Sequence, residues 1–213
     1  MLRNDRPVWC EIPTQGKFER FPALVAELVH LKIDIIVTAG ATTNRAAKEA
    51  TNTIPIVFAQ EGDPVASGLV ATLARPGGNI TGLSTLAPEL SGKRLEILRE
   101  VVPKLSRVAV LGTSTRPGHA QELREVELAA AAFKVQLQYL DVLDPKDIET
   151  AFRAASKGRA DGVLVLSSGV LNSRRTQVVG LVTKSRVPAI YPNTEYVEDG
   201  GLMYYGTSIT ESL

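Results

Sequence analysis

The sequence predicts an α/β protein with parallel β-sheets, folded as two similar lobes. Short apolar runs rich in β-branched residues alternate with longer amphipathic stretches along the chain, which is the pattern of repeated strand–helix units. Several of these runs are nearly continuous, as is typical of parallel strands that are buried on both faces. A second series of strand–helix units begins at Arg107, after a helix that ends at Pro103. We therefore expect the two lobes to join near residues 103–106.

The first half of the chain predicts strands that alternate with short helices. Phe21–Leu31 carries apolar residues at helical spacing, and Ile33–Thr38 is a β-branched run that predicts a strand buried on both faces. Val65–Leu73 predicts a short helix, which the Pro- and Gly-rich turn after Arg75 stops. The other elements expected here are strands over Val8–Ile12, Pro55–Ala59 and Ile80–Leu83 and a helix over Thr43–Thr51.

The second half repeats the alternation. It opens with an amphipathic helix over Leu90–Val102, which Pro103 ends because proline cannot continue the backbone hydrogen-bond ladder. Strands are expected over Arg107–Leu111, Gln136–Asp141, Gly162–Leu166, Pro188–Tyr191 and Gly201–Tyr205, and helices over His119–Phe133, Asp147–Ala155 and Ser173–Ser185.

Composition excludes several classes of protein and site. The 213 residues carry 24 Lys and Arg against 23 Asp and Glu, a net charge of +1, so we expect no nucleic-acid partner. Cys10 is the single cysteine, which rules out an intrachain disulfide and a zinc site built on several cysteines. The first residues lack the apolar stretch of a signal peptide, and no apolar run reaches membrane-spanning length.

Motifs of catalysis and cofactor binding are missing from the sequence. It contains no G-x-S-x-G, no P-loop, no H-E-x-x-H and no G-x-G-x-x-G. His30 and His119 lie in unrelated helical contexts, which argues against a metal or acid–base role for either. We therefore expect no catalytic residues, no metal site and no cofactor.

Short polar side chains follow the predicted strands, where parallel strands end in the crevice that binds ligands in α/β proteins. Hydroxyls and free backbone N–H groups bind carboxylates and other anions, and acidic side chains receive ammonium groups. These residues predict a ligand cleft between the lobes. The candidates are Thr38, Gln60, Asp63 and Ser84 in the first lobe and Thr113, Ser114, Ser167, Ser168, Asn193 and Glu195 in the second.

A purely local role competes with this interpretation, because Ser, Thr, Asn and Asp are also the preferred caps at helix N-termini. For any single candidate the capping role is at least as well supported. Asp63 is the most ambiguous, since an Asp-Pro pair at a helix start is by itself a capping signal.

Three segments carry a resemblance to a known family: Thr53–Val65, which includes Gly62-Asp63-Pro64, then Ala74–Ser84 and Leu90–Leu98. From about Val8 to Gly206 the chain resembles the substrate-binding components of ABC transporters of the TrpX-like group, which have the type I periplasmic-binding-protein fold. The resemblance implies two flavodoxin-like lobes, over residues 1–104 and 105–213. It also implies that lobe one is incomplete: the chain would start at the second strand of that lobe, lack its first strand–helix unit and be truncated at both ends.

The same resemblance implies a solute-binding component of an ABC importer, periplasmic or extracytoplasmic in the full-length protein. Its partners would be a small polar ligand, an amino acid or a related carboxylate, and a membrane permease. Many members have aromatic residues where this chain has Gly112-Thr113-Ser114 and Val170-Leu171-Asn172, which argues against an aromatic ligand. A ligand-sensing regulator of the same fold, a small α/β enzyme and a truncated chain that binds nothing remain as alternatives.

Overall fold

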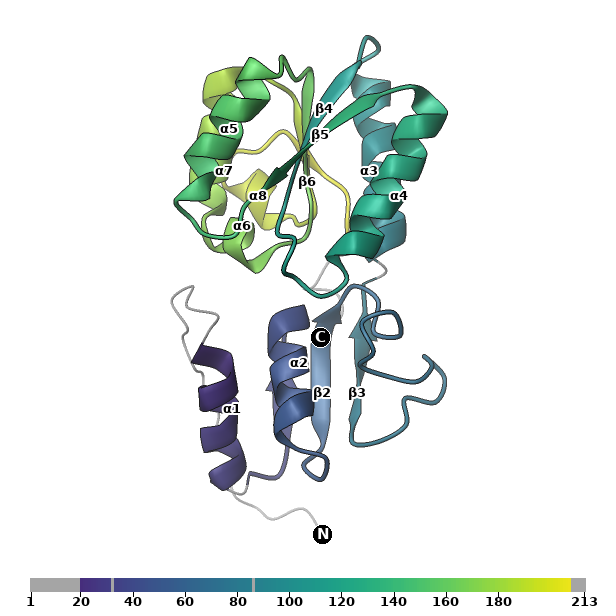
Figure 1. Cartoon of the computed structure of the whole chain (residues 1–213), viewed down its shortest axis with the longest axis vertical. Helices are drawn as coiled ribbons and strands as arrows, with labels where there is room; N and C mark the ends of the chain where they lie inside the picture. The colour runs from purple at the N-terminus through teal and green to yellow at the C-terminus, as the bar shows by residue number, and fades with distance from the viewer. Residues whose placement is uncertain (1–19, 32, 86, 208–213) are drawn as a thin grey trace.

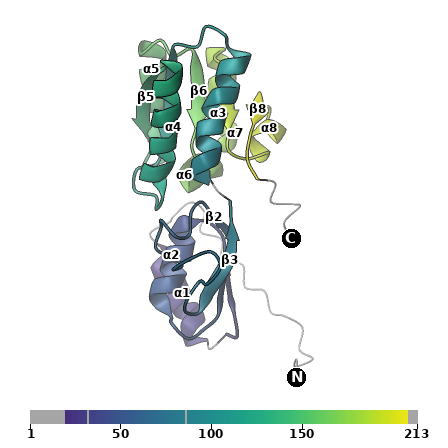
Figure 2. The ribbon, with the colours of Figure 1, turned by 90° about the vertical axis from the view of Figure 1, so that its right-hand side faces the viewer.

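Two separate parallel β-sheets form the framework of the protein (Figures 1 and 2). The computed structural model describes residues 20–31, 33–85 and 87–207. The first sheet has the order β1-β2-β3, and the second has the order β5-β4-β6-β7-β8. The strands are β1 Ile36–Thr38, β2 Ile56–Glu61, β3 Ile80–Ser84, β4 Arg107–Gly112, β5 Gln136–Asp141, β6 Gly162–Val165, β7 Ala189–Tyr191 and β8 Met203–Tyr204.

The second sheet is covered by helices on both faces. Val108 and Val110 of β4 pack with α3 and α4, while Ala109 and Leu111 face a core that includes residues of α5 and α7. Burial on both faces explains why β4 reads as a continuous apolar run in the sequence. The helices are α1 Phe21–His30, α2 Ala41–Ala50, α3 Ala87–Val101, α4 His119–Phe133, α5 Asp147–Lys157, α6 Gly169–Ser173, α7 Arg175–Ser185 and α8 Glu195–Glu198.

The first sheet is covered on one face only by the residues that the structure describes. Ile36, Ile56 and Ile80 lie side by side in the parallel register and pack with residues of α1 and α2. Val37 and Leu83 are 55 % and 47 % exposed on the other face. The prediction that Ile33–Thr38 is a strand buried on both faces is therefore wrong, because β1 is shorter and its central residue, Val37, faces outward.

The predicted helix over Val65–Leu73 is also wrong, because this segment forms a series of turns. Asp63 Oδ1 accepts hydrogen bonds from the Val65 and Ala66 N–H groups, so a helical turn does begin. It stops at Gly68, whose φ of +72° is left-handed, and the Val70 N–H returns to the Pro64 carbonyl. The predicted strand Val8–Ile12 lies outside the described residues.

Helix α3 belongs with the second sheet. Its Leu95 and Leu98 side chains are fully buried in the same core as Val108 and Val110, and α3 packs along α4 (Figure 2). This packing differs from the predicted division between residues 104 and 105, since the apolar face of α3 finds its partners in the second lobe. Among the described helices, none combines the length and apolar character needed to span a membrane.

Candidate ligand-binding site

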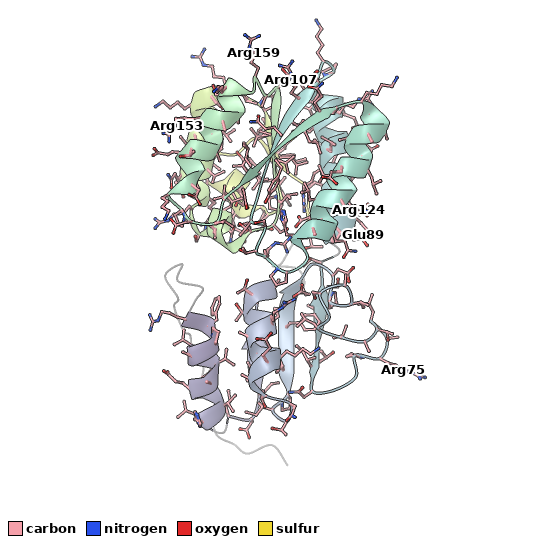
Figure 3. All side chains as sticks on the ribbon, viewed as in Figure 1. Arg75, Glu89, Arg107, Arg124, Arg153 and Arg159 are labelled. Atoms are coloured by element: carbon pink, nitrogen blue, oxygen red, sulfur yellow. The ribbon has the colours of Figure 1, made fainter. Side chains whose placement is uncertain are left out.

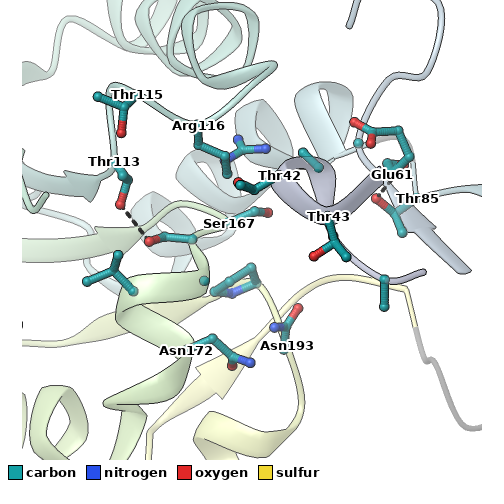
Figure 4. A pocket seen from close by; sticks show the side chains of 18 of the residues that line it. Thr42, Thr43, Glu61, Thr85, Thr113, Thr115, Arg116, Ser167, Asn172 and Asn193 are labelled. Atoms are coloured by element: carbon teal, nitrogen blue, oxygen red, sulfur yellow. Dashed lines mark hydrogen bonds between the residues drawn. The ribbon is translucent and has the colours of Figure 1, made fainter. Parts of the chain in front are cut away.

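A cavity of about 510 Å³ lies between the two sheets (Figure 4). Its walls come from the segments that follow the carboxyl ends of strands β1 to β7, so both lobes contribute. Thr42, Thr43, Glu61 and Thr85 line it from the first lobe. The second lobe supplies Thr113, Thr115, Arg116, Ser167, Ser168, Asn172 and Asn193, among others. The position agrees with the rule that open α/β sheets bind ligands beyond their strand ends.

Four residues predicted from the sequence line this cavity: Thr113, Ser167, Ser168 and Asn193. The hydroxyl oxygens of Thr113 and Ser168 are 2.6 Å apart, and Thr113 also donates to the Val142 carbonyl. Ser168 caps α6, since its Oγ accepts the Leu171 N–H at 3.2 Å. The capping role and the cavity position therefore coincide at this serine.

Five other predicted residues lie outside the cavity lining. Asp63 caps the turn after β2, and Ser84 donates to the Gly62 carbonyl. Ser114 bonds Asp141 through both its N–H and its hydroxyl. Thr38 is buried at the end of β1, and Glu195 begins α8. The remaining predicted residue, Gln60, lies in β2, and its side chain is outside the described part of the structure.

Asp63 has a second contact, which joins the two lobes. Its Oδ2 accepts a hydrogen bond of 3.0 Å from Gln121 Nε2 on α4. The same carboxylate therefore caps a turn in the first lobe and holds the start of α4 in the second.

Two arginines that were not among the predicted site residues line the cavity from the second lobe. Most arginines of the second lobe are on its surface, as Figure 3 shows for Arg107 and Arg159 at the end away from the first lobe. Arg94 and Arg116 instead line the cavity, and both pair with Glu122, whose carboxylate is fully buried. Two guanidinium groups thus share one carboxylate, which leaves one positive charge without an acidic partner.

Hydrogen bonds tie this carboxylate to both the core and the cavity. Glu122 Oε1 accepts from the Ser91 hydroxyl at 2.8 Å and from the N–H and hydroxyl of Ser167 at 3.1 Å each. Arg94 donates to Ser91 Oγ and to the Tyr205 carbonyl. Burial lowers the pKa of the Arg94 guanidinium, and the charge of Glu122 acts in the opposite direction.

Glu61 is the acidic group of the first-lobe wall. It ends β2, is 2 % exposed and accepts a hydrogen bond of 2.8 Å from Asn44 Nδ2 through Oε2. Burial raises the pKa of this carboxyl, while Asn44 and the charge of Arg116 lower it. Gln60 was among the predicted site residues and its neighbour Glu61 was not, although both follow the same apolar run.

The N-terminus of α2 completes this wall. Gly40 is the N-cap residue, no side chain caps the helix, and Ala41, Thr42 and Thr43 line the cavity. The first N–H groups of a helix have no partner within the helix and carry a partial positive charge. The cavity thus presents donors from α2, a carboxylate from β2 and a guanidinium from the β4–α4 loop.

Comparison with known proteins gives consistent matches. The model of a family described as ABC transporter substrate binding protein matches residues 12–212. The chain is 23 % identical over 184 residues to the Tyrosine-binding protein of Clostridioides difficile, covering 86 % of this chain and 52 % of that protein. It therefore spans about half the length of this curated relative.

Two solved structures superpose well on the fold. A conserved domain protein from Vibrio cholerae gives a TM-score of 0.84 at 26 % identity, covering 91 % of this chain and 64 % of that one. An ABC domain in complex with L-Trp from Streptococcus pneumonia also gives 0.84, at 22 % identity, covering 92 % of this chain and 67 % of that one. At 22 % identity, the similarity to the structure with L-Trp shows the fold alone.

Proposed function

Because the chain belongs to the family of ABC transporter substrate-binding proteins, we propose that it captures a small polar ligand between its two lobes. The ligand class is an amino acid or a related carboxylate, and closure of the lobes presents it to the permease of an ABC importer. The two-lobed α/β fold with parallel sheets is the type I periplasmic-binding-protein fold of such proteins. We place the full-length protein outside the cytoplasm, as is usual for this family.

The cavity between the sheets is the observation that carries this proposal. Its volume of about 510 Å³ falls within the roughly 300–1,000 Å³ of known small-molecule sites. Both lobes line it, so a ligand held there would link them and favour the closed arrangement. Its polar groups include a helix N-terminus and Arg116, which suit a carboxylate, and Glu61, which suits a cation.

Binding without chemistry is part of the same proposal. The hydroxyls of Thr113 and Ser168 are engaged with each other, with a backbone carbonyl and with the α6 N-terminus, so neither is set against a base. Phe21 is the one aromatic side chain among the described lining residues. The expectation against an aromatic ligand stays a prediction, and a ligand screen has to include aromatic compounds.

A thermal-shift screen of amino acids and small carboxylates on the purified chain tests the proposal. A ligand at about 100 times its Kd stabilises the folded protein by roughly 2.7 kcal/mol, a clear rise in Tm. Asn193→Ala should weaken the response, because Asn193 lines the cavity, whereas Asn52→Ala in an exposed turn should behave like the parent. If no compound raises Tm, or if both variants respond like the parent, the cavity is not the binding site.

A further inference from the structure

The carboxylate of Glu61 is only half satisfied by the protein. Oε2 accepts the Asn44 hydrogen bond, but Oε1 is buried and has no hydrogen-bond partner among the described residues. An ionised carboxylate without full compensation is costly to bury, so such a group is rarely kept without a partner. Because Glu61 lines the cavity, a bound ligand is the natural source of that partner.

The nearby cations are engaged elsewhere. Lys48 and Arg45 of α2 donate to the backbone carbonyls of residues 67–69. Arg116 attracts Glu61 electrostatically, yet its Nη2 pairs with Glu122 and its Nη1 donates to the Pro117 carbonyl. No salt bridge to Glu61 forms within the described part of the chain. The Gly62 N–H and the Ser67 hydroxyl also lower the pKa of the Glu61 carboxyl, but both are neutral donors, so neither supplies a positive charge.

Arg116 has the opposite need, because among the described residues one of its nitrogens lacks a hydrogen-bond acceptor where Glu61 Oε1 lacks a donor. Its Nε is buried and lacks an acceptor among the residues that the structure describes, and Arg116 lines the same cavity as the uncapped start of α2. The cavity therefore offers an unused acceptor on a carboxylate and unused donors on a guanidinium and a helix N-terminus. Complementary to this pair is a molecule that carries a cationic donor and an anionic acceptor together.

We propose that Glu61 receives a protonated nitrogen of the ligand and thereby makes the site select ammonium carboxylates over carboxylates that lack the nitrogen. The assignment rests on the proposed function and narrows its ligand class from amino acids or related carboxylates to compounds with both charges. The pKa of Glu61, which burial raises, is consistent with it, since a bound ammonium group would stabilise the ionised form.

Calorimetric titration with matched ligand pairs tests this assignment. The probes are L-leucine against 4-methylpentanoate, L-phenylalanine against 3-phenylpropionate, and L-tyrosine against 3-(4-hydroxyphenyl)propionate, which differ only in the amino group. An amino acid that binds should do so at least about tenfold more tightly than its partner, because hydrogen bonds between charged groups in a buried site are strong. These titrations on the unaltered protein need no variant that might unfold.

Variants then locate the effect at one residue. Glu61→Gln should weaken binding of the amino acid by about tenfold or more and leave binding of its nitrogen-free partner unchanged. Glu49→Gln, which removes the same charge from an exposed position on α2, should bind both probes like the parent. Circular dichroism of each variant checks that it is folded.

The outcomes separate the two proposals. If both members of a pair bind equally well, or if Glu61→Gln leaves the preference intact, the role of Glu61 is refuted while ligand capture stands. If none of the six compounds and none of the wider screen binds, the proposed function fails, and the Glu61 assignment fails with it.

Discussion

Replacement of Glu122 should strongly destabilise the second lobe. Its carboxylate is fully buried and bonds Arg94, Arg116, Ser91 and Ser167 at once. Glu122→Gln keeps the size and one carbonyl oxygen, but its NH₂ group then faces a guanidinium donor. At least one buried positive charge loses its partner, and breaking a buried ion pair in this way costs about 3–5 kcal/mol.

Urea unfolding followed by circular dichroism measures this loss. A thermal melt gives a second measure. For a chain of this size each kcal/mol corresponds to about 2–4 °C in Tm, so the melting temperature should fall by roughly 6–20 °C. Glu127→Gln, an exposed position on the same helix, should change the free energy of unfolding by less than about 0.5 kcal/mol.

A double variant sharpens the test. Glu122→Gln combined with Arg116→Met should lose less stability than the two single changes added together, because the double variant no longer buries the Arg116 charge that Glu122→Gln alone leaves without its partner. A loss below about 1 kcal/mol for Glu122→Gln, or strict additivity with Arg116→Met, would show that the shared carboxylate is not what balances the two arginines.

Three further predictions concern the first lobe. Burial raises the pKa of Glu61, so the folded protein favours the protonated carboxyl. The stability that this protonated group contributes is complete below the unfolded pKa of 4.5, and it is lost as pH rises through the higher pKa of the folded state. Unfolding at stepped pH should therefore show the parent losing stability relative to Glu61→Gln as pH rises from 4.5, and parallel profiles would contradict the burial of that charge. Gly82→Ala should destabilise the protein by about 1–3 kcal/mol, because its Cβ would stand 2.0 Å from the Phe58 carbonyl oxygen, whereas Gly180→Ala in α7 meets nothing within 4 Å and should be neutral or stabilising in the same melt. Hydrogen exchange should be faster in residues 36–84 than in residues 107–191, since the first sheet is covered on one face by the described residues; equal protection in the monomer would contradict this.

The sequence predicted those helices and strands whose formation depends mainly on their own residues. The apolar run Arg107–Leu111 predicted a strand, and the structure confirms one as β4. The prediction of burial on both faces was made for β1 and failed, because burial of Val37 depends on what covers the sheet and not on the residue itself. The expected helix after Val65 failed because apolar spacing alone ignores the left-handed turn at Gly68.

The candidate site was predictable only where it lies at strand ends. Thr113, Ser167 and Asn193 lie within two residues of the ends of their strands, and they line the cavity. Arg94 and Glu122 lie within helices, where charged residues usually face solvent, so strand-end reasoning could not find them. One signal was present: Arg94 shares a helix face with Leu98, four residues on, which indicates a charge turned toward the core.

Because Glu122 is shared between the fold and the cavity, the two walls of the cavity should differ in how well they tolerate substitution. Ser167 bonds the same carboxylate that pairs with Arg94 and Arg116, so a substitution that alters contacts to the ligand there also disturbs the folding of the lobe. Thr42 and Thr43, on the opposite wall, lie outside that network. Selection for a new ligand, or design of a fluorescent biosensor from this scaffold, should therefore begin with substitutions on the α2 wall, which change ligand contacts without disturbing the Glu122 network.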